Sequence, residues 1–142
     1  MLTSNDYFGK KITNPEVTPV IFARADEVLI PRVNKMLDAA RWAGVYTDKI
    51  DPDTGTRVSG SKNGNGDGGF RLSSSTTGAK NSKHKQAQAV DIYDPDDALD
   101  DWLTDERLQE FGLYREHPKY TPGWCHLQSV SPPSGNRTFK PF

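Results

Sequence analysis

The sequence predicts a single α+β domain in which N-terminal helices pack on a small antiparallel sheet. The chain has 142 residues, the length of one ordinary domain. Apolar residues recur at helical spacing in the first third of the chain, and two later segments alternate as strands do. We therefore expect one domain over residues 1–142, with its core at about 18–130 and an irregular, proline-rich tail at 131–142.

The predicted helical region begins near Thr18 and ends before Gly44. Thr18 followed by Pro19 fits a helix N-cap and first turn, and Gly44 fits a helix end. Pro31 lies inside this region, so we expect a kink there or two consecutive helices. Residues 1–17 are polar and rich in turn formers, and we expect them to wrap the surface.

Three segments have the composition of strands. Val45-Tyr46 could open a short strand, and Gln88 to Tyr93 reads as another. Trp124 to Val130 alternates along its length and is predicted to be a strand. The period of two places Cys125 on the opposite face from His126, so we interpret Cys125 as a buried core thiol.

The segments between these strands have different characters. Residues 60–69 form a glycine-rich run that we expect to be a mobile loop. This run lacks the Gly-Lys-Ser/Thr ending of a phosphate-binding loop, and no helical pattern follows it. Asp94-Pro95 is a strong helix start, and the helix should continue to about Glu110 before Gly112. We expect its acidic residues to form a solvated face.

Composition and charge exclude several classes of function. The formal net charge is -1, so the chain has no broad basic field of the kind that binds nucleic acid. No apolar run approaches the length of a membrane span, and the first residues do not form a signal peptide. The single cysteine excludes an intramolecular disulfide and a four-thiolate metal site.

Two of the three histidines of the chain lie in or beside the predicted strands. His84 precedes Asp91 by seven residues, which suits a loop that leads into a strand, and His126 lies on the other strand. If the two strands pair side by side, all three side chains can point to one face and bind one zinc ion. Spacing alone leaves open whether these histidines are ligands or structural residues.

A family resemblance supports the ligand interpretation. Residues 82–91 resemble the Ser-x-His-x-x-Gly-x-Ala-x-Asp signature of the D-Ala-D-Ala carboxypeptidase and L-alanyl-D-glutamate endopeptidase family. Ala87 replaces the usual glycine. Residues 69–74 resemble the family's Ser-Gly-Tyr-Arg-Ser element, and Trp124-Cys125-His126 matches its Trp-x-His. The resemblance covers about residues 18–130, and four signature positions are retained: Ser82, His84, Ala89 and Asp91.

The resemblance implies a fold, a cofactor and a mechanism. These zinc peptidases share their fold with the Hedgehog signalling domain, so a Hedgehog-like α+β fold is expected. One zinc ion would be held by His84, Asp91 and His126, with a water in the open position. Arg71 would lie in the cleft and pair with a substrate carboxylate or carbonyl oxygen. Ser82 would hydrogen-bond near the metal or the substrate.

The chain departs from the family pattern at the general base. Many family members have a catalytic glutamate three residues before the last histidine, where this chain has Gly123. The nearest upstream candidates are Glu116 and His117. We prefer Glu116, because a carboxylate near zinc suits proton abstraction followed by delivery to the leaving amine.

The expected function is therefore zinc-dependent hydrolysis of an amide bond in the peptidoglycan stem peptide or its cross-link. In its small size and its lack of a recognisable export signal, the chain resembles lysins encoded by phages. We expect either an endolysin, released from the host cytoplasm through a holin, or a lysin carried by the virion. We expect a monomer with a peptide substrate, and other virion proteins as further partners. The alternative, which Gly123 favours, is a non-catalytic virion structural or binding module on the same zinc-containing fold.

Overall fold

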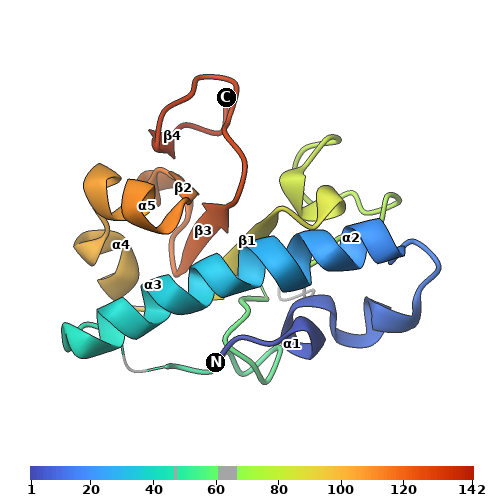
Figure 1. The fold of residues 1–142 in the computed structure, drawn as a ribbon, viewed down its shortest axis with the longest axis horizontal. Helices are drawn as coiled ribbons and strands as arrows, with labels where there is room; N and C mark the ends of the chain where they lie inside the picture. The colour runs from blue at the N-terminus through green and yellow to red at the C-terminus, as the bar shows by residue number, and fades with distance from the viewer. Residues whose placement is uncertain (47, 61–66) are drawn as a thin grey trace.

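A long helix crosses a small sheet, and shorter helices flank the sheet at both ends (Figure 1). The computed structural model describes residues 1–46, 48–60 and 67–142, so most of the predicted glycine-rich loop lies outside the described residues. The α-helices are α1 (Ser4–Phe8), α2 (Pro19–Ala23), α3 (Ile30–Trp42), α4 (Ala98–Trp102) and α5 (Asp105–Phe111). The strands are β1 (Ala89–Tyr93), β2 (Tyr114–Glu116), β3 (Trp124–Gln128) and β4 (Thr138–Phe139). The predicted α+β class is confirmed.

The sheet is mixed rather than antiparallel throughout. Its strand order is β1-β3-β2-β4, and β1 and β2 both pair antiparallel with β3. The side-by-side pairing on which the predicted zinc cluster depends is present, because β1, at one end of the strand order, pairs with β3. However, β4 lies in the tail that we expected to be irregular, and it pairs parallel with β2. The tail returns along the free edge of β2, where the Arg115 N–H donates to Arg137 O at 2.8 Å.

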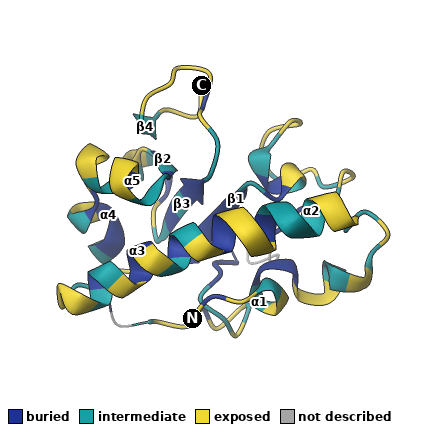
Figure 2. Cartoon of the chain, viewed as in Figure 1, coloured by how far each residue is buried: buried dark blue, intermediate teal, exposed yellow. Residues whose placement is uncertain are grey.

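The two faces of the sheet have different roles. Val90 and Ile92 of β1 and Cys125 and Leu127 of β3 are buried in the hydrophobic core. Cys125 is therefore the predicted core thiol, on the opposite face from His126. Burial also raises the pKa of this thiol well above its ordinary value. Figure 2 shows the buried face of α3 turned toward this sheet, which leaves the other face for polar residues.

The predicted N-terminal helical region is continuous but changes its turn geometry. Thr18 caps α2 through its side chain, as predicted, and Gly44 follows α3 with a φ of 72°. Between α2 and α3 the chain forms a π-helix, η2 (Arg24–Leu29). Pro31 lies just after this π-helix. Because proline has no backbone N–H, it cannot donate the hydrogen bond of a regular α-helical turn, and the wider turn before it accommodates its ring.

The acidic helix region is divided and partly buried, contrary to our expectation. Instead of one helix from Asp94 to about Glu110, the chain forms α4 and α5, because Thr104 starts a new helix by accepting from Arg107 N. The carboxylate of Asp94 accepts the N–H groups of Leu99 and Asp100. Asp94 and Asp100 are both buried, so this acidic run is not simply a solvated face.

The N-terminal segment belongs to the core rather than to the surface. Tyr7 and Phe8 of α1 are each 2% exposed. The Phe8 ring stacks on Phe22 at 5.7 Å and packs against Phe70 at 5.4 Å. Residues 9–17 are exposed or half-buried, as expected, but the expectation was wrong for α1, because these aromatic side chains anchor it in the core.

The predicted strand at Val45-Tyr46 does not form. The N–H groups of Val45 and Tyr46 both donate back to Ala40 O and so continue the helix end. No helix in the described part of the chain is both long and apolar enough to cross a membrane.

Candidate metal centre

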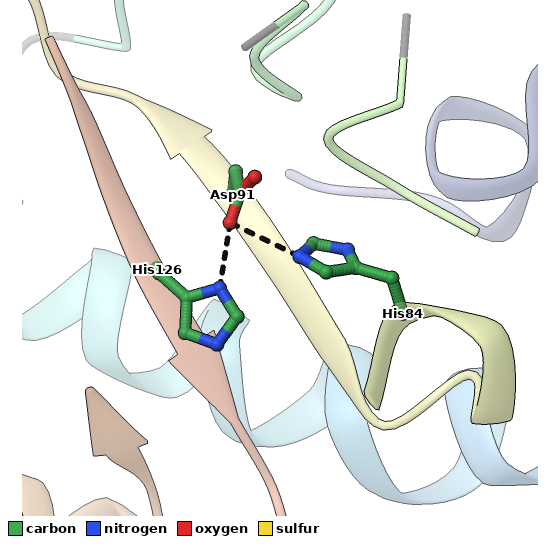
Figure 3. A group of neighbouring side chains, drawn as sticks. All are labelled: His84, Asp91 and His126. Atoms are coloured by element: carbon green, nitrogen blue, oxygen red, sulfur yellow. Dashed lines mark hydrogen bonds and ion pairs between the residues drawn. The ribbon is translucent and has the colours of Figure 1, made fainter. Parts of the chain in front are cut away.

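Three side chains from three elements converge on the polar face of the sheet (Figure 3). His84 comes from the 3-10 helix η3 (Lys83–Gln86), Asp91 from β1, and His126 from β3, directly opposite Asp91. Asp91 Oδ1 lies 3.3 Å from His84 Nε2 and 2.8 Å from His126 Nδ1. The predicted cluster of three is thus brought together, and the three residues could hold a metal ion.

Local sequence explains how η3 presents His84. The Ser82 hydroxyl accepts the N–H of His84 at 3.2 Å and caps the helix. Ala87 ends it in the left-handed conformation, with a φ of 56°. Glycine adopts this conformation most readily, which gives the glycine of the family signature a physical reason. Here alanine occupies the position, so the turn is retained at some cost in backbone strain.

Both imidazoles are oriented by acceptors on their outer sides. His84 Nδ1 lies 2.8 Å from Gly69 O, a carbonyl that can only accept. His126 Nε2 lies 3.0 Å from Gln128 Oε1. If each of these outer nitrogens carries the proton, the lone pairs of His84 Nε2 and His126 Nδ1 face Asp91. Metal-binding histidines are typically held by such outer acceptors.

Gly69 is required for this arrangement by close packing. A Cβ on Gly69 would lie 2.0 Å from the carbonyl oxygen of Tyr7. The same oxygen accepts the N–H of Phe70 at 3.1 Å. The carbonyl that orients His84 is therefore fixed against the N-terminal helix, and a side chain at Gly69 would displace one of the two segments.

The electrostatics favour a cation at the centre. Burial by itself would raise the pKa of Asp91, but His84 and His126 outweigh this effect and hold that pKa far below its usual value. Burial lowers the pKa of His84, whereas the hydrogen bond and charge of Asp91 raise that of His126. A carboxylate between two imidazoles is a donor set that suits a divalent cation.

Arg71 and Ser82 lie beside the cluster, as predicted, but their contacts are within the protein. Arg71 is 7% exposed. Its Nη2 lies 3.6 Å from Asp91 Oδ2, its Nε donates to Asp67 O at 2.7 Å, and its Nη1 donates to Thr77 O at 3.3 Å. Nη1 also lies 3.5 Å from Ser82 Oγ. Arg71 therefore braces the carboxylate of Asp91, and its contact with substrate stays a prediction.

A cavity of about 660 Å³ opens over the cluster. Glu116 is one of the residues that border this cavity. Arg115 of β2 pairs with Leu127 of β3, so the next residue of β2, Glu116, lies opposite His126. Burial raises the pKa of Glu116, an effect that His126 partly offsets. His117, the other predicted candidate, does not reach this cavity. It is exposed, and its Nδ1 accepts the N–H of Lys119 at 3.1 Å.

Gln128 and the C-terminal segment are parts of the site that the sequence interpretation missed. Gln128 is buried and also donates to Val130 O at 2.9 Å, which fixes its amide. Its position two residues after His126 on a strand was the available signal, because period-two alternation puts both on one face. Phe139 of β4 packs edge-on against His126 at 6.0 Å, and no sequence pattern had indicated this contact.

Replacing Gln128 with alanine is expected to weaken zinc binding by about 10- to 100-fold, the usual effect of removing an outer partner of a ligand. The variant loses the acceptor that orients His126 but keeps all three ligand atoms. Competition with a chromogenic chelator measures the affinity. Gln109→Ala, on the exposed face of α5, is the matched control. Unchanged affinity in Gln128→Ala would show that Asp91 alone orients the ring.

A second acidic group lies near α4. Asp94, Asp97 and Asp100 place carboxylate oxygens within 4.8 Å of one another. Asp94 already accepts backbone N–H groups, and Asp100 pairs with Arg115 at 3.3 Å. These contacts give two of the three carboxylates a structural role in the helix start, so we assign no metal to this group.

No protein-family model, curated protein or solved structure matches the chain. The function is therefore inferred from the site itself.

Proposed function

We propose that the protein is a zinc-dependent peptidase that hydrolyses an amide bond in the stem peptide or cross-link of peptidoglycan. One observation carries the proposal: two oriented imidazoles and an ionised carboxylate meet at the floor of a cavity that is bordered by a further carboxylate, Glu116. Catalytic zinc sites typically combine three protein ligands of these types with one open position. The resemblance of residues 82–91 and 124–126 to the zinc peptidase signature supports the choice of substrate.

The donor atoms fit zinc in number, type and spacing. Zinc bonds of about 2.0–2.2 Å in tetrahedral geometry need ligand atoms roughly 3.3–3.5 Å apart. The separations from Asp91 Oδ1 to His84 Nε2 and His126 Nδ1 are 3.3 and 2.8 Å. The first already suits this geometry, and the second would have to open by about 0.5–0.7 Å. The three ligand atoms all lie within 4.8 Å of one another. Soft metal ions that prefer thiolate ligands are excluded from this site, because the single cysteine, Cys125, lies on the opposite face of the sheet.

In the proposed reaction, the chain's own residues position the metal and move one proton. Zinc, when bound, would polarise the scissile carbonyl and lower the pKa of the attacking water. Glu116 takes a proton from that water as its oxygen bonds to the carbonyl carbon. The same carboxyl then gives the proton to the amide nitrogen as the C–N bond breaks, which leaves a carboxylic acid and an amine. Arg71 keeps Asp91 in place during these steps.

Turnover of purified murein tests the proposal. We expect release of soluble fragments by the protein, loss of release after incubation with a chelator, and recovery when zinc is restored. Fragment analysis by mass spectrometry identifies the bond that is cut. A protein that binds one equivalent of zinc yet leaves murein and its isolated stem peptides intact would contradict the peptidase proposal.

The second candidate function is a non-catalytic virion structural or binding module that keeps zinc for stability. Gly123 favours it, because the position where family members have a glutamate carries no side chain and adopts a φ of 90°. Such a module would still bind zinc and lose stability with a chelator. It would hydrolyse nothing, and Glu116→Gln would have no effect on its binding to murein.

A further inference from the structure

We infer that Lys83 and Lys140, which both line the cavity, form a binding site for a free carboxylate of the peptide substrate. This inference deepens the proposed function and rests on it for the position of the scissile bond. It assigns the selectivity of the site to peptides with a free carboxylate over the same peptides with a carboxamide.

The cavity is a cleft with a floor and two walls. The polar face of the sheet forms the floor, with Asp91, Glu116 and His126. Residues 78–84, which lead into η3, form one wall and include Lys83. The C-terminal segment at 132–142 supplies the other wall and includes Lys140. Both lysines therefore border the space in which a peptide would lie above the candidate cluster.

The C-terminal wall is held in place by specific contacts. The His117 N–H donates to Phe139 O at 2.7 Å, which fixes the residue before Lys140. The ring of Phe139 packs edge-on against His126, and that of Phe142 packs edge-on against Tyr120 at 5.5 Å. Lys140 lies between these two anchored residues, so its backbone is fixed at the cleft.

The charges that border the cleft favour an anion once a metal is bound. Two acidic and three basic side chains line it: Asp91, Glu116, Arg71, Lys83 and Lys140. The two carboxylates are balanced by two of these cations, and a divalent zinc ion would add two further positive charges. The resulting field attracts a negatively charged ligand, because a cleft of one sign concentrates ions of the other.

The lysines are the cations available to a ligand. The guanidinium of Arg71 is buried against Asp67, Thr77 and Asp91, so a substrate carboxylate would have to displace those partners. By contrast, the ammonium groups of Lys83 and Lys140 have no ion pair among residues 1–46, 48–60 and 67–142. Lys140 is also exposed and can reach a ligand at the mouth of the cleft.

The test compares two synthetic stem peptides that are identical except that the free carboxylates of one are carboxamides in the other. Isothermal titration calorimetry measures their binding to zinc-loaded Glu116→Gln protein, which cannot consume them by the proposed mechanism. We expect the carboxylate peptide to bind on the order of five- to tenfold more tightly. Lys83→Gln and Lys140→Gln should each reduce this preference, and the double variant should remove it.

Lys35→Gln, an exposed lysine of α3 away from the cleft, is the control for the lost charge and should keep the full preference. Equal affinity for the two peptides, or a preference that survives in the double variant, would overturn the inference even if the protein cleaves murein. Selective binding without any cleavage by the wild-type protein would uphold carboxylate recognition and contradict the peptidase proposal. Binding of neither peptide would overturn the inference, whereas turnover of murein by the wild-type protein decides the peptidase proposal separately.

Discussion

Replacement of Asp91 with alanine is expected to abolish zinc binding and to destabilise the fold. The Asp91 carboxylate is 2% exposed, and one ring nitrogen of each candidate ligand, His84 and His126, faces it. Its loss removes one ligand and leaves Arg71 without its buried counter-charge. Removing one member of a buried charge pair costs about 3–5 kcal/mol of unfolding free energy, and the stabilisation supplied by zinc is lost as well.

Thermal unfolding with and without zinc measures both parts of this effect. Wild-type protein should melt at a higher temperature when zinc is added, whereas Asp91→Ala should melt at a lower temperature that zinc does not change. His84→Ala and His126→Ala should likewise lose the response to zinc. Asp101→Ala removes an exposed acid of α4 and should behave as wild type. A zinc response that persists in Asp91→Ala would exclude this cluster as the metal site.

Replacement of Glu116 with glutamine is expected to lower kcat by about 10²- to 10⁴-fold, the usual contribution of a general base. The amide keeps the size of the side chain and its place opposite His126, but it cannot accept the proton of the attacking water. Zinc affinity and melting temperature should stay close to those of the wild type. This combination separates loss of proton transfer from loss of the metal.

Initial rates of stem-peptide cleavage, followed by chromatography, measure the effect. Glu110→Gln on the exposed face of α5 is the matched control and should retain full activity. His117→Gln should also retain activity, because His117 lies outside the cavity. Full activity in Glu116→Gln would assign the proton transfer to another group.

Local sequence patterns were enough to predict the parts of the site that lie on regular structure. Period-two alternation placed His126 and Cys125 on opposite faces of a strand, and Thr18 and Gly44 marked the ends of the helical region. The sequence left open whether the two strands would pair, and the pairing of β1 with β3 brings Asp91 beside His126. The alternation and the helix ends depend on neighbouring residues, whose spacing the sequence displays directly.

Features that depend on distant segments could not be predicted in the same way. The tail joins the sheet because the edge of β2 is free, and no pattern at Thr138–Phe139 specifies that partner. Helix α1 enters the core because Phe8 finds Phe22 and Phe70. Likewise, only the folded chain places Gly69 against Tyr7, which makes a glycine necessary there.

The contacts of α1 with Phe70 and with β1 also bear on the order of events in folding. The Tyr7 hydroxyl donates to Ala89 O at 2.8 Å, across 82 positions of sequence, and Tyr7 O accepts the N–H of Phe70. Contacts of such long range form slowly, because the entropy of loop closure must be overcome first. We therefore expect the cluster of His84, Asp91 and His126 to assemble late, after the N-terminal segment has docked. The rate of zinc uptake during refolding should then report the final step of assembly rather than the first collapse.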